Sequence, residues 1–284
     1  MKLMKAKWFW LLLLVVVACF SLLAAGGYLE RAVRANSIAF TVAQLTLRAY
    51  RSVTQIPAEV YRAAQITFRA HRHELNDPEA IHEYLKSHPV RKLQLGAGSS
   101  NPIGWLNTDI EPQGEQVYLD VTKRYPLPDG SFQYVFSEHV IEHVPWEGGL
   151  AMLKECYRVL APGGKVRIVT PNLTKFIELL FGTADDAQRF IETKLRYYYK
   201  WPITPVPEAY IFNRELRDFG HQFLYDPATL RKTFELAGFK QITEHGVTEK
   251  TDPVFQEAEL RTRDVGSDLW YFNNWESMAF EAVR

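Results

Sequence analysis

Two features are scarce in this 284-residue chain, cysteine and an excess of charge of one sign, and each excludes some classes of protein. It has only two cysteines, Cys19 and Cys156, and neither fits a disulfide framework or a zinc-site spacing. It has no excess of charge, because 33 basic residues balance 33 acidic ones. No global field therefore argues for a nucleic-acid partner. What is abundant is apolar content, at 47% hydrophobic residues, which predicts a large buried core.

The N-terminus departs from this balance with one long uncharged run. Residues 8–29, "WFWLLLLVVVACFSLLAAGGYL", carry no charge and are long enough to cross a bilayer, which takes about 20 apolar residues. A cleaved signal peptide is the alternative, favoured by the small residues 24–26. The run is longer, however, than the roughly 7–15 apolar residues of a typical signal peptide. We therefore expect residues 1–29 to form a retained transmembrane helix, a signal-anchor.

Residues 30–75 predict an amphipathic helical linker. Apolar residues recur there at helical spacing, and Pro57 should kink or divide the helix. Four arginines separated by multiples of seven share one flank: Arg34, Arg48, Arg62 and Arg69. Three roles stay open, namely an interfacial helix facing anionic lipid, packing against the following domain, and a coiled-coil dimer. The alanine-rich seam favours the coiled coil least.

Residues 76–284 are expected to form the main domain. Predicted strands and helices alternate there, which is typical of a three-layer α/β fold. "KLQLGAG" predicts a buried strand that ends in a glycine turn, where a missing Cβ lets a ligand approach the backbone. "GWLNTDI" predicts a second strand ending at Asp109, and an acid there can accept both hydroxyls of a ribose. A third strand is expected to end at Asp120.

The sequence then predicts a fourth strand over Phe132–Ser137, an amphipathic helix, a glycine turn, and a fifth strand over Lys165–Thr170. One spacing is unusual. Only Ser99–Trp105 separate the first glycine turn from the second strand, whereas a parallel crossover usually needs about a dozen residues. We therefore expect the first crossover helix to be reduced to a loop, which a ligand without phosphate would tolerate.

In order and spacing, these pieces resemble the class I S-adenosylmethionine-dependent methyltransferases, in particular their small bacterial type-11-like branch. "PLPDGSFQYVFSEHVIEH" and "RVLAPGG" carry the resemblance, which covers residues 91–172 and returns over residues 217–239. It implies a Rossmann-like three-layer sandwich with a mostly parallel sheet, and S-adenosyl-L-methionine as cofactor. The cofactor contacts that it implies are Leu95, Gly96, Ala97, Gly98, Asp109, Ile110, Asp120, Val121, Ser137 and Glu138.

In the family's pattern, the glycines lie against the methionine part of the cofactor, Asp109 holds the ribose, and Asp120 with Val121 meets the adenine. This sequence departs from the pattern at Gln94, where the family usually has an acid, and at Ser99–Ser100, where it has a third glycine. Asp109 and Asp120 as ordinary turn-forming acids stay open as alternatives. A nicotinamide-dependent oxidoreductase is disfavoured, because the glycine turn opens no long helix.

Methyl transfer is a displacement at a sulfonium, so a base is needed only when the acceptor must lose a proton. His139 and His221 are the candidate bases, and each can equally be a hydrogen-bonded structural histidine. His139 and His143 also have the spacing of a metal-binding pair, but no third ligand stands out, so we predict no metal site. Residues 176–218 are expected to form a substrate-binding or lid insertion. Its aromatic residues suit sugar stacking, a membrane surface or simple packing.

Taken together, the sequence predicts a membrane-tethered S-adenosylmethionine-dependent methyltransferase. The acceptor is a small molecule or a glycan- or lipid-linked species, with cell-envelope sugars and lipid-linked intermediates fitting the anchor. Basic residues flank the apolar run on both sides, so charge alone fixes no orientation. The cytosolic origin of the cofactor places the catalytic domain in the cytosol of a single-pass protein. The alternative is a non-catalytic membrane-anchored scaffold with a methyltransferase fold.

Overall fold

The chain divides into two compact units, residues 1–76 and 77–284. The computed structural model describes residues 77–183, 186–199, 206–249, 251–259 and 266–284. The predicted anchor over residues 1–29 and the predicted linker over residues 30–75 therefore lie outside the described residues. Within the described ranges, no helix is both long and apolar enough to cross a membrane.

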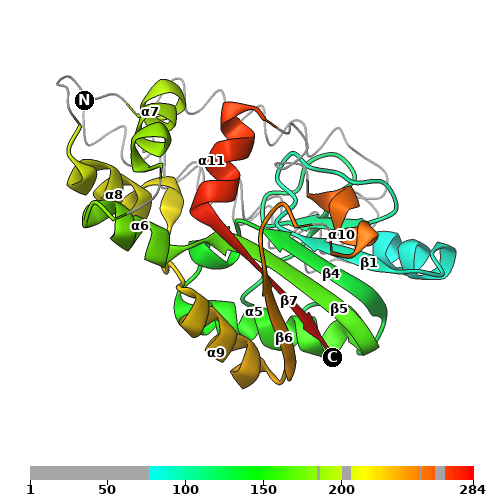
Figure 1. The fold of residues 1–284 in the computed structure, drawn as a ribbon. Coiled ribbons are helices and arrows are strands. Elements are labelled where there is room, and N and C mark those ends of the chain that lie inside the picture. Colours follow the sequence, from blue (N-terminus) through cyan, green and yellow to red (C-terminus); the bar gives the residue numbers. More distant parts are fainter. Residues whose placement is uncertain (1–76, 184–185, 200–205, 250, 260–265) are drawn as a thin grey trace, which may run out of the picture. The chain divides into compact units, whose positions relative to one another are not determined.

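The described part of the second unit is built on a seven-stranded sheet with the order β3-β2-β1-β4-β5-β7-β6 (Figure 1). The first five strands are parallel, and β7 runs antiparallel to both β5 and β6. The predicted fold class, a Rossmann-like α/β domain with a mostly parallel sheet, is thereby confirmed. The strands are β1 (Lys92–Leu95), β2 (Leu106–Asp109), β3 (Val117–Tyr118), β4 (Phe132–Glu138), β5 (Leu160–Pro171), β6 (Gln241–His245) and β7 (Ser277–Val283).

The predicted reduction of the first crossover is also confirmed. Residues 96–105, between β1 and β2, contain turns but no helix, and the two strands are nevertheless parallel neighbours. Two strand boundaries were wrong. β3 ends at Tyr118 rather than at Asp120, because residues 121–123 form a turn. β5 begins at Leu160 and takes in the glycine turn, because Leu160 already pairs with Phe132 of β4.

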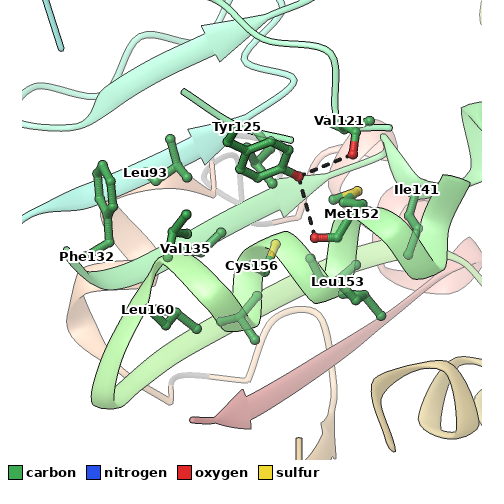
Figure 2. Close-up of a cluster of buried hydrophobic side chains, with 14 of the residues drawn as sticks. Leu93, Val121, Tyr125, Phe132, Val135, Ile141, Met152, Leu153, Cys156 and Leu160 are labelled. Atoms are coloured by element: carbon green, nitrogen blue, oxygen red, sulfur yellow. Dashed lines mark hydrogen bonds between the residues drawn. The ribbon is translucent and has the colours of Figure 1, made fainter. Parts of the chain in front are cut away.

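The larger hydrophobic core covers one face of the sheet. Alternate residues of β7 point into it, namely Met278, Phe280 and Ala282, as the two-residue period of a strand requires. The helices α5 (Trp146–Val159) and α9 (Pro227–Ala237) contact each other and contribute buried side chains to this core. Figure 2 shows part of it, with Tyr125 between β1 and α5 and its hydroxyl directed at the carbonyls of Val121 and Met152.

A smaller core covers the opposite face, where α10 (Pro253–Ala258) packs on β4 through Phe255, Phe136 and Trp105. One buried cation lies here as well. The Arg167 guanidinium donates to Glu259 at 2.5 Å and to Glu281 at 2.8 Å. Both faces of the sheet are thus covered, and the ends of the strands remain as the place for a site.

Four helices form a separate group, which we call the helical cluster: α6 (Leu173–Leu180), α7 (Ala187–Tyr197), α8 (Glu208–Arg217) and α11 (Asp268–Glu276) (Figure 1). Their buried side chains make a core of their own, with Phe190 stacked on Trp275 at 4.0 Å between ring centroids. The first three of these helices occupy most of the predicted insertion, residues 176–218. Of its aromatic run, Tyr199 is buried and donates to Glu215, whereas Tyr197 and Tyr198 stay half exposed.

Candidate functional site

The turn after β1 holds the first group of predicted contacts. Leu95 and Ala97 are buried, and the Ala97 amide donates to the Thr108 carbonyl of β2. Gly96 and Gly98 have φ of +64° and +55°, which favour glycine. A Cβ at Gly96 would lie 2.2 Å from Val140 Cγ2, so the protein itself requires this glycine. A Cβ at Gly98 would meet no heavy atom within 4 Å, so the space beside Gly98 is open to a ligand.

Asp109 ties the turn after β1 to the turn after β2. Its Oδ2 accepts the Gly98 amide at 2.8 Å, and its Oδ1 accepts the Glu111 amide at 2.7 Å. The Glu111 contact is what an ordinary turn-forming acid would make, which was the alternative interpretation of Asp109. Each carboxylate oxygen nevertheless keeps a second lone pair that can accept another hydrogen bond. The carboxylate can therefore hold its own loop and still accept two ligand hydroxyls. Ile110 beside it is exposed.

Asp120 and Val121 lie in the turn after β3. Asp120 Oδ1 accepts both the amide and the hydroxyl of Thr122, at 2.9 and 2.7 Å. The Val121 side chain is buried and its carbonyl accepts the Tyr125 hydroxyl. These contacts of Asp120 are those of a turn-forming acid. The predicted adenine contact stays a prediction.

Two buried polar atoms mark the ends of β1 and β4. Ser137 Oγ and Gln94 Oε1 are both buried, and neither has a hydrogen-bond partner among the described residues. The two residues lie on neighbouring strands, since Leu95 pairs with Ser137. A buried polar atom without a partner is costly, so a further partner, such as a ligand or a water molecule, is expected. Open space at Gly98, the Asp109 carboxylate and the Ser137 hydroxyl together fit a polar ligand at the ends of these strands. Gln94 pairs with Phe136 rather than with Ser137, so its side chain points to the other face of the sheet.

Beyond Glu138, the chain turns into a short 3₁₀ helix, η1 (Ile141–His143), through His139, whose φ of 53° is unusual for a non-glycine residue. His139 Nε2 lies 3.1 Å from Ser277 Oγ and its Nδ1 lies 3.2 Å from Glu142 Oε1. Glu142 is fully buried and also accepts the Thr170 hydroxyl. Burial raises the pKa of the Glu142 carboxyl, but the hydrogen bond and charge of His139 outweigh burial, so the pKa lies below its usual value.

The second predicted base, His221, comes to the same place from far along the chain. It follows η2 (Asp218–Gly220), and its ring lies 5.1 Å from the ring of His143. Its Nδ1 lies 2.7 Å from the Glu215 carbonyl. The fold thus groups Glu142, His143 and His221, with donor atoms within 4.8 Å of one another. The sequence did not show this grouping, because nothing local joins His143 to a residue in another segment.

Comparison with known proteins agrees with the predicted family. Residues 93–168 match the family model described as "Methyltransferase domain". A curated protein of Mycolicibacterium smegmatis, a probable S-adenosylmethionine-dependent methyltransferase, is 45% identical over 51 residues, which are 18% of this chain. The chain spans only 19% of that relative's length in the match. The predicted family is thereby confirmed for the matched segment, which belongs to the methyltransferase domains.

Two solved structures are similar over a larger share of the chain. One is a SAM dependent methyltransferase from Archaeoglobus fulgidus, 19% identical, covering 75% of this chain and 94% of that one with a TM-score of 0.42. The other is an S-adenosylmethionine dependent methyltransferase from Mesorhizobium loti, 15% identical, covering 72% of this chain and 98% of that one with a TM-score of 0.41. The name of the curated relative from Mycolicibacterium smegmatis agrees with the predicted enzyme class and with the predicted cofactor.

Proposed function

We propose that this protein is a membrane-tethered, S-adenosylmethionine-dependent methyltransferase. One observation carries the proposal. The Asp109 carboxylate accepts the Gly98 amide at the open edge of the sheet, inside the segment that matches the methyltransferase domain family. This contact brings an acid for ribose hydroxyls beside a backbone that a ligand can approach. Ordinary packing would not leave the buried Ser137 hydroxyl without a partner.

Bound there, the cofactor supplies a methyl group already activated on a sulfonium. Asp109 would hold its ribose, and the turn at Gly98 and the Ser137 hydroxyl would contact the rest of it. What the chain adds is position and exclusion of water. An acceptor hydroxyl would also have to lose its proton. With Nδ1 of His221 donating to the Glu215 carbonyl, its Nε2 is left able to accept one. His139 is less suited to this role, because both of its ring nitrogens face protein partners.

The membrane tether is the second part of the proposal. It is supported by the uncharged run of residues 8–29, which is long enough for a bilayer. The catalytic domain would lie in the cytosol, where the cofactor is made. In that orientation the arginines of residues 30–75 would face the anionic inner leaflet, where each contributes about 1 kcal/mol when it is close to the surface.

For the acceptor, we propose a cell-envelope sugar or a lipid-linked intermediate. A tethered enzyme meets such molecules at the membrane. The helical cluster offers apolar side chains to a lipid-like or ring-shaped acceptor, because Ile177, Phe181, Tyr197 and Tyr198 are exposed there. Exposed aromatic faces bind sugar rings and also lie well at a membrane interface.

Calorimetric titration of the full chain in detergent micelles tests the proposal. We expect S-adenosylhomocysteine to bind one-to-one and NAD not to bind. If NAD binds in its place, the enzyme class is wrong. If S-adenosylhomocysteine does not bind, the result favours the alternative hypothesis of a non-catalytic scaffold. Binding of the cofactor without methyl transfer to any envelope or lipid-linked acceptor would also favour the scaffold.

A further inference from the structure

We propose that Glu142, His143 and His221 form a binding site for one divalent transition-metal cation, with coordination positions left open. The proposal starts from the grouping of these three side chains, whose donor atoms all lie within 4.8 Å of one another. Two imidazoles and one carboxylate are a donor set that zinc and other first-row cations accept, with the remaining positions free for water or substrate.

The grouping is fixed by the backbone rather than by chance contact of side chains. The Gln222 and Phe223 amides donate to the Glu142 carbonyl at 2.8 and 3.2 Å. The Gln222 side-chain amide donates to the His143 carbonyl at 2.8 Å. These three hydrogen bonds clamp the segment that carries His221 onto η1. The distance between the two histidines is therefore a property of the fold.

The turn before His221 is bent in an unusual way. Phe219 has a φ of 61° and Gly220 a φ of 81°, so two successive residues are left-handed. For a phenylalanine this conformation is strained, and such strain collects at functional sites. The bend brings Gly220 against the His143 ring, since a Cβ there would lie 3.8 Å from His143 Nδ1. The strained turn thus sets where His221 faces His143.

The ring nitrogens are arranged as metal-binding histidines usually are. His221 Nδ1 lies 2.7 Å from the Glu215 carbonyl, and a donated N–H there leaves Nε2 as the free lone pair. Metal-bound histidines commonly use their second nitrogen in this way. His143 Nε2 lies 4.0 Å from Glu142 Oε1. Tetrahedral zinc holds its donors about 3.3 Å apart. The three donor atoms, which lie within 4.8 Å of one another, therefore have to move closer together when a cation binds. The His143 side chain is 36% exposed and has room to turn.

Glu142 supplies a reason for a cation to be there. Its side chain is fully buried, and its described partners are the Thr170 hydroxyl and the imidazoles of His139 and His143. None of these carries a permanent positive charge, although buried carboxylates are ordinarily paired with one. A bound cation would neutralise the carboxylate. His139, whose Nδ1 lies 3.2 Å from Glu142 Oε1, would act as a positioning residue for it.

A role for the cation rests on the proposed function, whereas its binding does not. The cation's open positions would take an oxygen of the methyl acceptor. With His221 Nε2 bound to the cation, that nitrogen could not also serve as the base. The divalent ion would instead lower the pKa of such an oxygen, so the acceptor could lose its proton to water near neutral pH. The chemistry expected of the acceptor is therefore a hydroxyl-bearing molecule able to coordinate a metal, such as a sugar with neighbouring hydroxyls.

The test uses the full-length protein in detergent, stripped with a chelator and titrated with Zn²⁺ by calorimetry and with Co²⁺ by visible absorption. We expect one tight site and a Co²⁺ spectrum of low coordination number, and we expect Mg²⁺ to compete poorly because it prefers oxygen ligands. His143→Gln and His221→Gln should weaken Zn²⁺ by more than the about 100-fold that loss of an outer-shell partner can cost. His82→Gln, an exposed histidine outside the site, is the matched control and should change nothing.

Melting curves of the metal-free proteins show whether each variant folds, and a second readout keeps the test decisive. Zn²⁺ should raise the melting temperature of the parent and of His82→Gln but not of the two ligand variants. Equal Zn²⁺ affinity in the parent and both ligand variants, or no Zn²⁺ binding by the parent, would overturn the site. S-adenosylhomocysteine binding is measured on the same samples. If the protein binds Zn²⁺ but not S-adenosylhomocysteine, the proposed function is contradicted and the metal site is supported.

Discussion

Removal of the Asp109 side chain is the perturbation that discriminates best, because this carboxylate lies where the loop and the proposed ligand meet. In the free protein it accepts the amides of Gly98 and Glu111 at 2.8 and 2.7 Å. In the complex it would accept ribose hydroxyls as well. A hydrogen bond to a charged group contributes about 1.5–3 kcal/mol. Asp109→Ala should therefore weaken S-adenosylhomocysteine about 10- to 150-fold.

Asp109→Asn separates the two roles of this side chain. The amide keeps one acceptor oxygen, so one backbone amide can still be satisfied, while its NH₂ group faces the other amide donor. We expect binding by this variant to fall between that of the parent and that of Asp109→Ala. Glu244→Ala is the matched control, since it removes an exposed acid from β6, outside the described site.

Calorimetry with S-adenosylhomocysteine measures these affinities, and a melting curve of each variant records the cost to the fold. Parent-like affinity in Asp109→Ala would refute the ribose assignment. A loss of affinity equal to the loss of folded protein would refute the direct contact, since the side chain would then act only through the loop.

Four further predictions follow from the described structure. Gly98→Ala should fold with a cost of about 1–2 kcal/mol, because its φ of +55° disfavours a side chain while its Cβ meets nothing, yet S-adenosylhomocysteine binding should fall much further. Lys194→Met should destabilise the chain by about 3–5 kcal/mol in a denaturant titration, since it leaves the carboxylates of Glu215 and Glu276 buried without their cation, whereas exposed Lys232→Met should cost under about 1 kcal/mol. Cys156 is buried, and burial raises the pKa of its thiol, so peptide mass spectrometry should find it unlabelled by thiol reagents until the chain unfolds. The full chain should remain in membranes after alkaline carbonate extraction, and recovery of a mature chain beginning near Gly26 would establish a cleaved signal peptide instead.

The sequence could predict those features of the site that are set by neighbouring residues, but not those set by contacts between distant segments. The helix-free connection between β1 and β2 was predictable, because residues 99–105 are too few for a crossover helix. For the glycine at position 96 the structure adds a reason that the sequence did not show, because Val140 lies in the way of a Cβ. This requirement comes from packing of another segment, so no local pattern could show it. The predicted cofactor contact of Gly96 stays a prediction.

Two other features could not be predicted, for the same reason. β7 was missed because it follows α11 directly, with no glycine or proline between them, so the sequence reads as one aromatic-rich tail. The approach of His221 to His143 was missed because the backbone of Gln222 bonds to η1 across a large gap in sequence. Such long-range pairing leaves no periodicity or spacing that a local pattern could show.

The absence of helices between the first strands explains why polar side chains hold the turns of the proposed cofactor site. Residues 96–131 contain no helix, so the turns after β1, β2 and β3 lack the crossover helices that would ordinarily hold them. Gln116, nearly fully buried, takes over part of that role. Its amide group donates to the Gly98 carbonyl at 2.8 Å and to Asn101 Oδ1 at 2.9 Å, and its oxygen accepts the Gln113 amide.

Asp109 and Gln116 thus hold Gly98 from both sides, one at its amide and the other at its carbonyl. Under the proposed function, Asp109 would have two roles, because the same carboxylate would build the turn and bind the ribose. That would link the stability of this turn to cofactor binding. Bound cofactor should therefore slow hydrogen exchange at the Gly98 amide, because it would stabilise the Asp109 carboxylate that accepts this amide.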